Sequence, residues 1–226
     1  MSTMLDFALL ASAVYDNPPN AAGWTCAKSR SGAYGFQAAA YTQGKETVIA
    51  FRGTAVAGDV GADLKLGVGM NTNHFSQADD FVADFLKTEN LSLCGHSLGG
   101  AIAQIVGNRS SLKFATFNAP GVAVVASRNI LEANPVMLGV RMAGAVVGAL
   151  VNPMQAARDV RATFNTVTGV NICLTGDVVS KIGVHYGNVV RIPGTGLNPA
   201  TQHGIGTVIE VLRQNPVGKL TIESLA

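Results

Sequence analysis

Four short apolar runs, mostly separated by helical stretches, constrain the fold of this chain more than any other feature. They cover residues 91–94, 114–117, 172–174 and 189–192. Strands that are buried on both faces appear in the sequence as continuous apolar runs, and the helices between them cover the two faces of the sheet. We therefore expect an α/β fold with a mostly parallel central sheet and helices on both faces.

An antiparallel hairpin is expected at the N-terminal side of this sheet. Residues 35–41 and 47–51 both have strand character, and Gln43-Gly44 between them can form a tight turn. Two strands joined by so short a turn must pair antiparallel.

Helix-start signals appear in three places. Thr3 and Asp6 form a capping box before a helix predicted over residues 4–15, and Ser76 and Asp79 form a similar box before the run at 91–94. A last amphipathic helix is predicted to begin near His203.

Length and composition indicate one globular domain. The chain has 226 residues, of which 48% are hydrophobic and 13% charged, so a large core can form and disorder is excluded. We interpret residues 1–226 as a single domain, with 122–168 as a helical insertion or cap. The net charge of +2 is too small to indicate a nucleic-acid partner.

The cysteines and the N-terminus indicate a protein without a disulfide framework or a classical signal peptide. Cys26, Cys94 and Cys173 are odd in number and never at metal-ligand spacing, so we expect neither metal nor cofactor. Residues 1–15 lack a basic n-region, and the apolar run 136–151 is short for a membrane span. We expect a soluble protein, cytoplasmic or exported by a signal-independent route.

Gly95-His96-Ser97-Leu98-Gly99 matches the pattern G-x-S-x-G between an apolar strand and a helical run. In this context the pattern predicts a nucleophile elbow, a sharp turn that exposes a reactive serine at the top of an α/β-hydrolase sheet. Glycine two residues before and after the serine removes side chains that would collide with the neighbouring strand and helix. Ser97 is the candidate nucleophile.

A serine nucleophile needs a general base and a carboxylate that orients it, and in this fold they follow in the order acid, then histidine. Asp177 comes directly after the run at 172–174, where α/β sheets build their sites. His203 lies after the last strand, whereas His185 precedes that strand and is expected at its wrong end. The other acids in the interval, Glu132 and Asp159, are interpreted as solvated helix residues.

The chain resembles the class 3 lipase family of α/β-hydrolases. The pieces that carry the resemblance are 48–54 (VIAFRGT), 95–101 (GHSLGGA), 116–121 (TFNAPG), 176–179 (GDVV) and His203. The resemblance implies that Thr54 supplies one oxyanion donor and the backbone N–H of Leu98 the other.

Three functions are compatible with this set of residues. The first is a lipase that hydrolyses lipid esters through an acyl-enzyme on Ser97. The second is a phospholipase of the A type, such as a bacterial toxin delivered by a secretion machine. A third, non-enzymatic class is a lipid-binding protein on a hydrolase fold.

The partner expected from these functions is a lipid or other ester substrate. The segment 122–168 bears on how the protein contacts that substrate. This segment is apolar with a small positive charge, so it contacts a lipid interface transiently, lies buried in the core or covers the acyl pocket.

Overall fold

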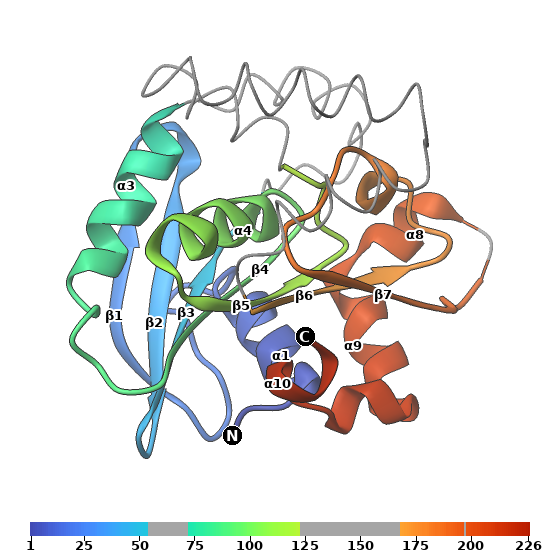
Figure 1. Ribbon diagram of the computed structural model, residues 1–226, viewed down its shortest axis with the longest axis horizontal. Coiled ribbons are helices and arrows are strands. Elements are labelled where there is room, and N and C mark those ends of the chain that lie inside the picture. Colours follow the sequence, from blue (N-terminus) through green and yellow to red (C-terminus); the bar gives the residue numbers. More distant parts are fainter. Residues whose placement is uncertain (54–71, 123–167, 197) are drawn as a thin grey trace, which may run out of the picture.

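The computed structural model describes residues 1–53, 72–122, 168–196 and 198–226. Within them, seven strands form one sheet whose spatial order follows the sequence (Figure 1). The strands are β1 (Thr25–Ser31), β2 (Gln37–Gln43), β3 (Glu46–Phe51), β4 (Leu91–His96), β5 (Lys113–Phe117), β6 (Gly169–Leu174) and β7 (Asn188–Ile192).

Strand pairing changes from antiparallel to parallel at β3. β2 and β3 form the predicted hairpin, and β1 adds to β2 in the same antiparallel sense. From β3 to β7 every neighbouring pair is parallel. The predicted α/β class, with a mostly parallel sheet and an antiparallel N-terminal hairpin, is therefore confirmed. The carboxyl ends of β3 to β7 meet at one edge, which is where such sheets place their sites.

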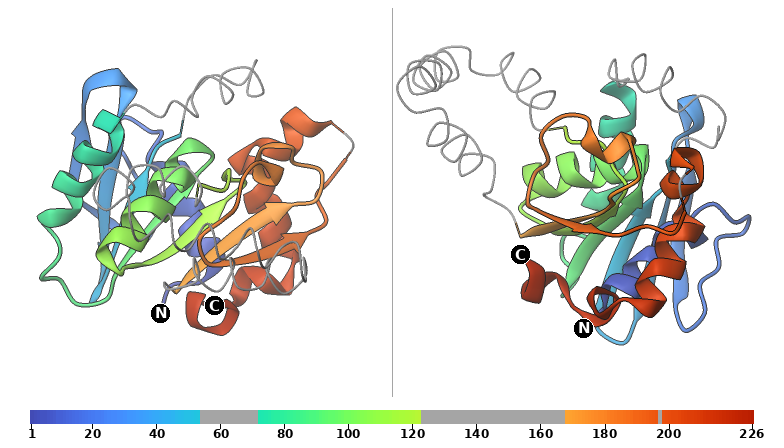
Figure 2. Two further views of the ribbon diagram at one scale, coloured as in Figure 1. Left: turned by 45° about the horizontal axis from the view of Figure 1, so that its top comes forward. Right: turned by 90° about the vertical axis from the view of Figure 1, so that its right-hand side faces the viewer.

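Helices cover both faces of the sheet (Figures 1 and 2). α1 (Met4–Ala13) and α9 (Ile205–Gln214) pack on one face, and α3 (Thr72–Ala83) and α4 (Leu98–Ser110) pack on the other. The shorter helices are η1 (Ala33–Gly35), η2 (Val179–Lys181), α8 (Pro199–His203), η3 (Pro216–Lys219) and α10 (Ile222–Leu225).

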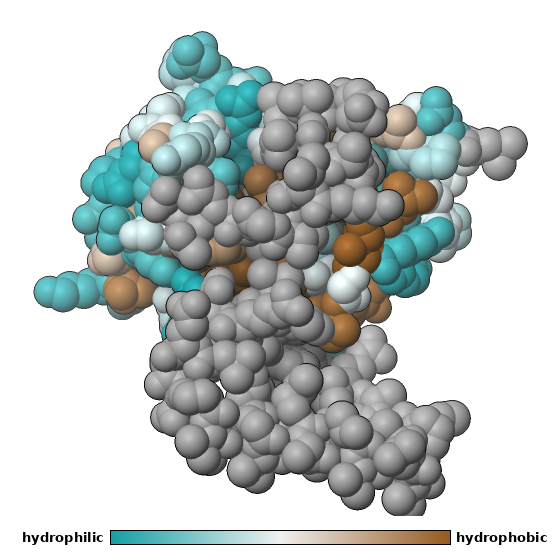
Figure 3. All heavy atoms as spheres, turned by 90° about the horizontal axis from the view of Figure 1, so that it is seen from above, coloured by the Kyte–Doolittle hydropathy of each residue, from teal (hydrophilic) through white to brown (hydrophobic). Residues whose placement is uncertain are grey.

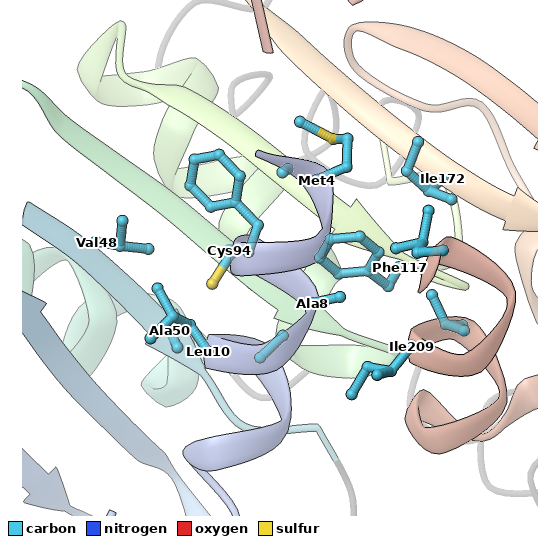
Figure 4. Close-up of a cluster of buried hydrophobic side chains, with 14 of the residues drawn as sticks. Met4, Ala8, Leu10, Val48, Ala50, Cys94, Phe117, Ile172 and Ile209 are labelled. Atoms are coloured by element: carbon cyan, nitrogen blue, oxygen red, sulfur yellow. The ribbon is translucent and has the colours of Figure 1, made fainter. Parts of the chain in front are cut away.

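Two hydrophobic clusters, one on each face, hold these layers together. Successive residues of β3 alternate between them: Val48 and Ala50 join the cluster under α1, while Ile49 and Phe51 join the cluster under α4. This is the two-residue period of a strand buried on both sides. Figure 4 shows α1 lying across the sheet, with side chains of the helix and of the elements that it packs against: Met4, Ala8, Leu10, Val48, Ala50, Cys94, Phe117, Ile172 and Ile209.

The start of α1 agrees with its predicted signal. The Thr3 hydroxyl accepts a hydrogen bond from the Asp6 backbone N–H at 3.3 Å, and the Asp6 carboxylate accepts one from the Thr3 N–H at 2.9 Å. The predicted box at Ser76 and Asp79 is wrong, because α3 already begins at Thr72. Asp79 instead pairs with Arg109 of α4 at 3.0 Å.

β1 was not predicted, because its residues are mostly polar and exposed, as suits a strand at the edge of a sheet.

The segment 122–168 lies outside the described residues except at its two ends. Among the helices that the structure does describe, none combines the length and apolar character needed to cross a membrane.

Candidate active site

Ser97 occupies a sharp turn between β4 and α4. Its backbone has φ 56° and ψ −127°, which lies far from both strand and helix geometry. A positive φ is costly for a residue with a side chain and persists only where the surroundings enforce it. The turn is held by the Ser97 N–H, which donates to the Phe117 carbonyl at 3.1 Å, and by the Ser97 carbonyl, which accepts from Ala101 at 3.1 Å.

The two glycines of the pattern allow this turn because each lies against main chain. A Cβ on Gly95 would lie 2.4 Å from the carbonyl of Gly99, and a Cβ on Gly99 would lie 2.0 Å from the carbonyl oxygen of Phe51. Both distances are shorter than any real Cβ contact, and main chain cannot rotate away as a side chain can. The glycines are therefore a steric requirement of the elbow, as the sequence predicted.

His203 and Asp177 complete a hydrogen-bonded chain with Ser97. Nε2 of His203 lies 2.9 Å from Oγ of Ser97, and Nδ1 of His203 lies 2.9 Å from Oδ1 of Asp177. The three residues are 5%, 8% and 0% exposed, in the order Ser97, His203, Asp177. Three side chains that are distant in the sequence thus meet at the carboxyl edge of the sheet.

Asp177 is held as a buried carboxylate. Burial raises its pKa, but the hydrogen bond and charge of His203, together with the hydrogen bond from the Ser180 backbone N–H, outweigh burial, so the net pKa lies below its usual value. The backbone N–H groups of Val179 and Ser180 donate to its two oxygens at 3.2 and 2.8 Å. An ionised carboxylate only accepts, so Nδ1 of His203 carries the proton and Nε2 is free to accept one from Ser97.

A family model for a Tle-like phospholipase domain matches residues 6–139, more than half of the chain. The chain belongs to the Tle-like phospholipase domain family. It is therefore a hydrolase of the lipase and phospholipase type that acts on lipid esters. Among solved structures, lipase II from Rhizopus niveus is similar at 12% identity and a TM-score of 0.40, covering 77% of this chain and 71% of that one. No curated protein matches the chain significantly.

The remaining candidate residues of this phospholipase-like domain have three different outcomes. Leu98 begins α4, so its N–H is one of the free donors in the first turn of the helix. Thr54, Glu132 and Asp159 lie outside the described residues. His185 is separate from the Ser97 chain, with its Nε2 lying 3.0 Å from the Ser180 carbonyl. Within the described part of the chain, no three His, Cys, Asp or Glu side chains are placed to hold a metal ion.

His203 lies in a short helix and not in the loop where it was predicted. It ends the short helix α8, and α9 begins two residues later, whereas the sequence indicated a loop residue before the last helix. Asn198 caps α8 by accepting from Ala200, and Pro199 occupies the first turn. A cap followed by proline is a recognised helix start, so the sequence held a signal for α8.

Asn118 supports the site and was not predicted individually. Its side-chain amide donates to the carbonyls of Gln202 and His203 at 2.7 and 3.2 Å, and its Oδ1 accepts from the Leu174 N–H at 2.9 Å. It therefore joins the ends of β5 and β6 to the helix that carries the histidine. Because each of these contacts spans more than 50 residues of sequence, no local pattern could have indicated it.

Proposed function

We propose that this chain hydrolyses the acyl ester bonds of glycerophospholipids through a covalent acyl-enzyme on Ser97, with His203 as general base and Asp177 as the orienting carboxylate. The observation that carries the proposal is the hydrogen-bonded chain from Ser97 through His203 to Asp177, with 2.9 Å at each link. Hydroxyl, imidazole and carboxylate in this order are the constellation of nucleophilic acyl transfer.

The reaction follows from the donors and acceptors in the site. Nε2 of His203 accepts the proton of Ser97 as Oγ attacks the ester carbonyl, and Asp177 stabilises the resulting imidazolium. The Leu98 N–H, with Thr54 as proposed partner, donates to the oxyanion. His203 then protonates the leaving alcohol, and a water molecule, activated in the same way, hydrolyses the acyl-enzyme.

Phospholipid is favoured over triacylglycerol by the family to which the chain belongs. Exposed apolar side chains that follow Asp177 in the chain suit either acyl lipid: Val178, Ile182 and Val184 are 49%, 38% and 37% exposed, whereas Asp177 itself is buried. Figure 3 views the molecule from above and shows hydrophobic residues at the surface beside the grey atoms. We call the three residues Val178, Ile182 and Val184 the apolar loop.

The non-catalytic alternative is disfavoured by the state of the site. A lipid-binding protein has no need of an ionised carboxylate and a histidine whose free nitrogen lies within hydrogen-bond distance of a strained serine. Backbone strain of this kind is typical of functional residues and costs about 1–3 kcal/mol unless the surroundings compensate.

A substrate panel tests the proposal. Vesicles of phosphatidylglycerol and phosphatidylethanolamine, and tributyrin emulsion, are incubated with the wild type and with Ser97→Ala. We expect fatty acid and lysophospholipid as products, with no product from the variant. Release of head group or of phosphatidic acid would contradict acyl-ester cleavage, and hydrolysis of tributyrin but of neither phospholipid would contradict the substrate class.

A further inference from the structure

A second buried histidine, His96, lies directly before Ser97 in the chain and contacts the backbone of His203. Nε2 of His96 is 2.7 Å from the main-chain carbonyl of His203, and the two rings lie 4.9 Å apart between centroids. His96 is 7% exposed. The mechanism above assigns it no chemical task, so its burial beside the site calls for another explanation.

The proton position on His96 follows from its partners. A carbonyl can only accept, so Nε2 must carry the proton and donate it to His203. Burial, reinforced by the neighbouring His203, lowers the pKa of His96 to about 4, so the ring is neutral near pH 7. Nδ1 is then an acceptor, and it lies 3.4 Å from the hydroxyl of Tyr15.

Tyr15 extends this chain to the loop that leaves β3. Its oxygen accepts a hydrogen bond from the Gly53 N–H at 3.0 Å, which leaves its own proton to be donated to His96. Burial raises the pKa of Tyr15, so the hydroxyl stays protonated. Arg52 stacks over the Tyr15 ring, with its guanidinium carbon 5.2 Å from the centroid. All donors therefore point in one direction, from Gly53 through Tyr15 and His96 to the His203 carbonyl.

The His203 carbonyl has structural importance because α8 is only five residues long. The last carbonyls of a helix lack partners within the helix, and a single-turn helix has little stability of its own. His96 and Asn118 satisfy the His203 carbonyl from inside the protein. The backbone of the general base is thus fixed by the residue that precedes the nucleophile.

We propose that His96 and Tyr15 are positioning residues of this active site. His96 holds the backbone of His203 at the distance that Ser97 requires, and Tyr15 fixes the tautomer of His96 while joining it to Gly53, the residue before Thr54. This inference rests on the proposed function, because the position of His203 matters only if it accepts the proton of Ser97.

Two amide substitutions separate positioning from mere filling of space. The amide nitrogen of His96→Gln can replace Nε2 and still donate to the His203 carbonyl, whereas His96→Asn is shorter and replaces only Nδ1. We expect His96→Gln to keep kcat within about 5-fold of wild type and His96→Asn to lower it about 50-fold, with KM little changed, because a displaced base can cost about 100-fold in rate. The reaction rate of Ser97 with a fluorophosphonate should fall in parallel.

Tyrosine-to-phenylalanine substitutions provide a matched pair. Tyr15→Phe removes the link between Gly53 and His96, and we expect kcat to fall about 10-fold because hydrogen bonds that orient the site are lost. Tyr41→Phe removes another buried hydroxyl, one that makes no hydrogen bond within the described part of the chain, and it should leave kcat unchanged. Thermal unfolding of each variant verifies that it is folded.

Ser97→Ala, assayed beside these variants on the same phospholipid vesicles, distinguishes the two possible failures. If Ser97→Ala is inactive while His96→Gln and His96→Asn have equal kcat, the positioning role is overturned and the proposed function stands. If Ser97→Ala hydrolyses phospholipid like the wild type, both are overturned. If Ser97→Ala is inactive, a loss of kcat in His96→Asn and Tyr15→Phe but not in His96→Gln or Tyr41→Phe supports the inference.

Discussion

Gly99, at the start of α4, lies directly against Phe51, the last residue of β3, so that a Cβ on Gly99 would meet the Phe51 carbonyl oxygen at 2.0 Å. We predict that Gly99→Ala destabilises the protein by about 2–4 kcal/mol, since neither backbone can move without displacing the elbow. Urea unfolding of the variant measures the change.

Gly206→Ala is the matched control for this substitution. Gly206 lies in α9, and a Cβ there would meet nothing within 4 Å. Alanine in a helix is favoured over glycine by about 0.5–1 kcal/mol, so this variant should be slightly more stable than wild type. Equal effects of the two substitutions would contradict the steric account of the elbow.

Asp177→Asn should leave the protein folded and remove most of its activity. The neutral amide is nearly the same size, but it can donate to Nδ1 of His203 and so favour the tautomer whose Nε2 cannot accept a proton. We expect kcat on phospholipid to fall about 10⁴-fold, as for the equivalent change in serine proteases. A variant that retains more than a tenth of wild-type kcat would show that Asp177 is not the orienting acid.

Acid should destabilise the protein in two stages. The pKa of His96 is about 4 in the folded protein and near 6.5 in the unfolded chain. As pH falls through this window, the unfolded chain therefore binds a proton that the folded protein does not. The free energy of unfolding should therefore decrease between pH 6.5 and 4, by at most about 3 kcal/mol. Below about pH 4, the lowered pKa of Asp177 adds a further loss, because its carboxylate contributes stability only while ionised.

His96→Gln isolates the first of these stages, because glutamine does not titrate. Its unfolding free energy, measured in urea at several pH values, should depend less on pH between 6.5 and 4 than that of the wild type. Identical pH dependence in the two proteins would mean that His96 does not carry the effect.

The apolar loop should matter for lipid aggregates rather than for chemistry. Replacing Ile182 and Val184 by serine removes exposed apolar surface and leaves Ser97, His203 and Asp177 in the sequence. We expect vesicle hydrolysis to fall about 30-fold, since each of the two lost apolar contacts with lipid weakens binding by about 1 kcal/mol. Hydrolysis of a soluble short-chain ester should change less than 2-fold by the same reasoning. An equal loss on both substrates would argue against lipid contact.

The parts of the fold with strong local signals were predictable from sequence. Continuous apolar runs identified β4 to β7, because a strand that is buried on both faces consists mostly of apolar residues. A short turn identified the β2–β3 hairpin. β1 has no such apolar run, since an exposed edge strand carries polar residues. The start of α3 was misplaced because Ser76 and Asp79 have capping spacing but lie inside the helix.

The candidate site shows the same division between local and distant information. Ser97 was indicated by glycines two residues before and after it. Chain order and position relative to the strands indicated Asp177 and His203, which the structure brings together with Ser97. Tyr15 and His96 could not be linked from sequence, because their contact joins positions 81 residues apart. The oxyanion role of Thr54 and delivery of the protein as a toxin both stay predictions.

The most direct test of the account is a mass-spectrometric map of the adduct formed by a fluorophosphonate probe on the native protein. We predict a single adduct on the peptide that contains Ser97, formed more slowly while phospholipid competes for the site and more slowly in Asp177→Asn. Labelling of another residue, or a Ser97 that does not react in a protein that hydrolyses phospholipid, would contradict the assignment of the nucleophile.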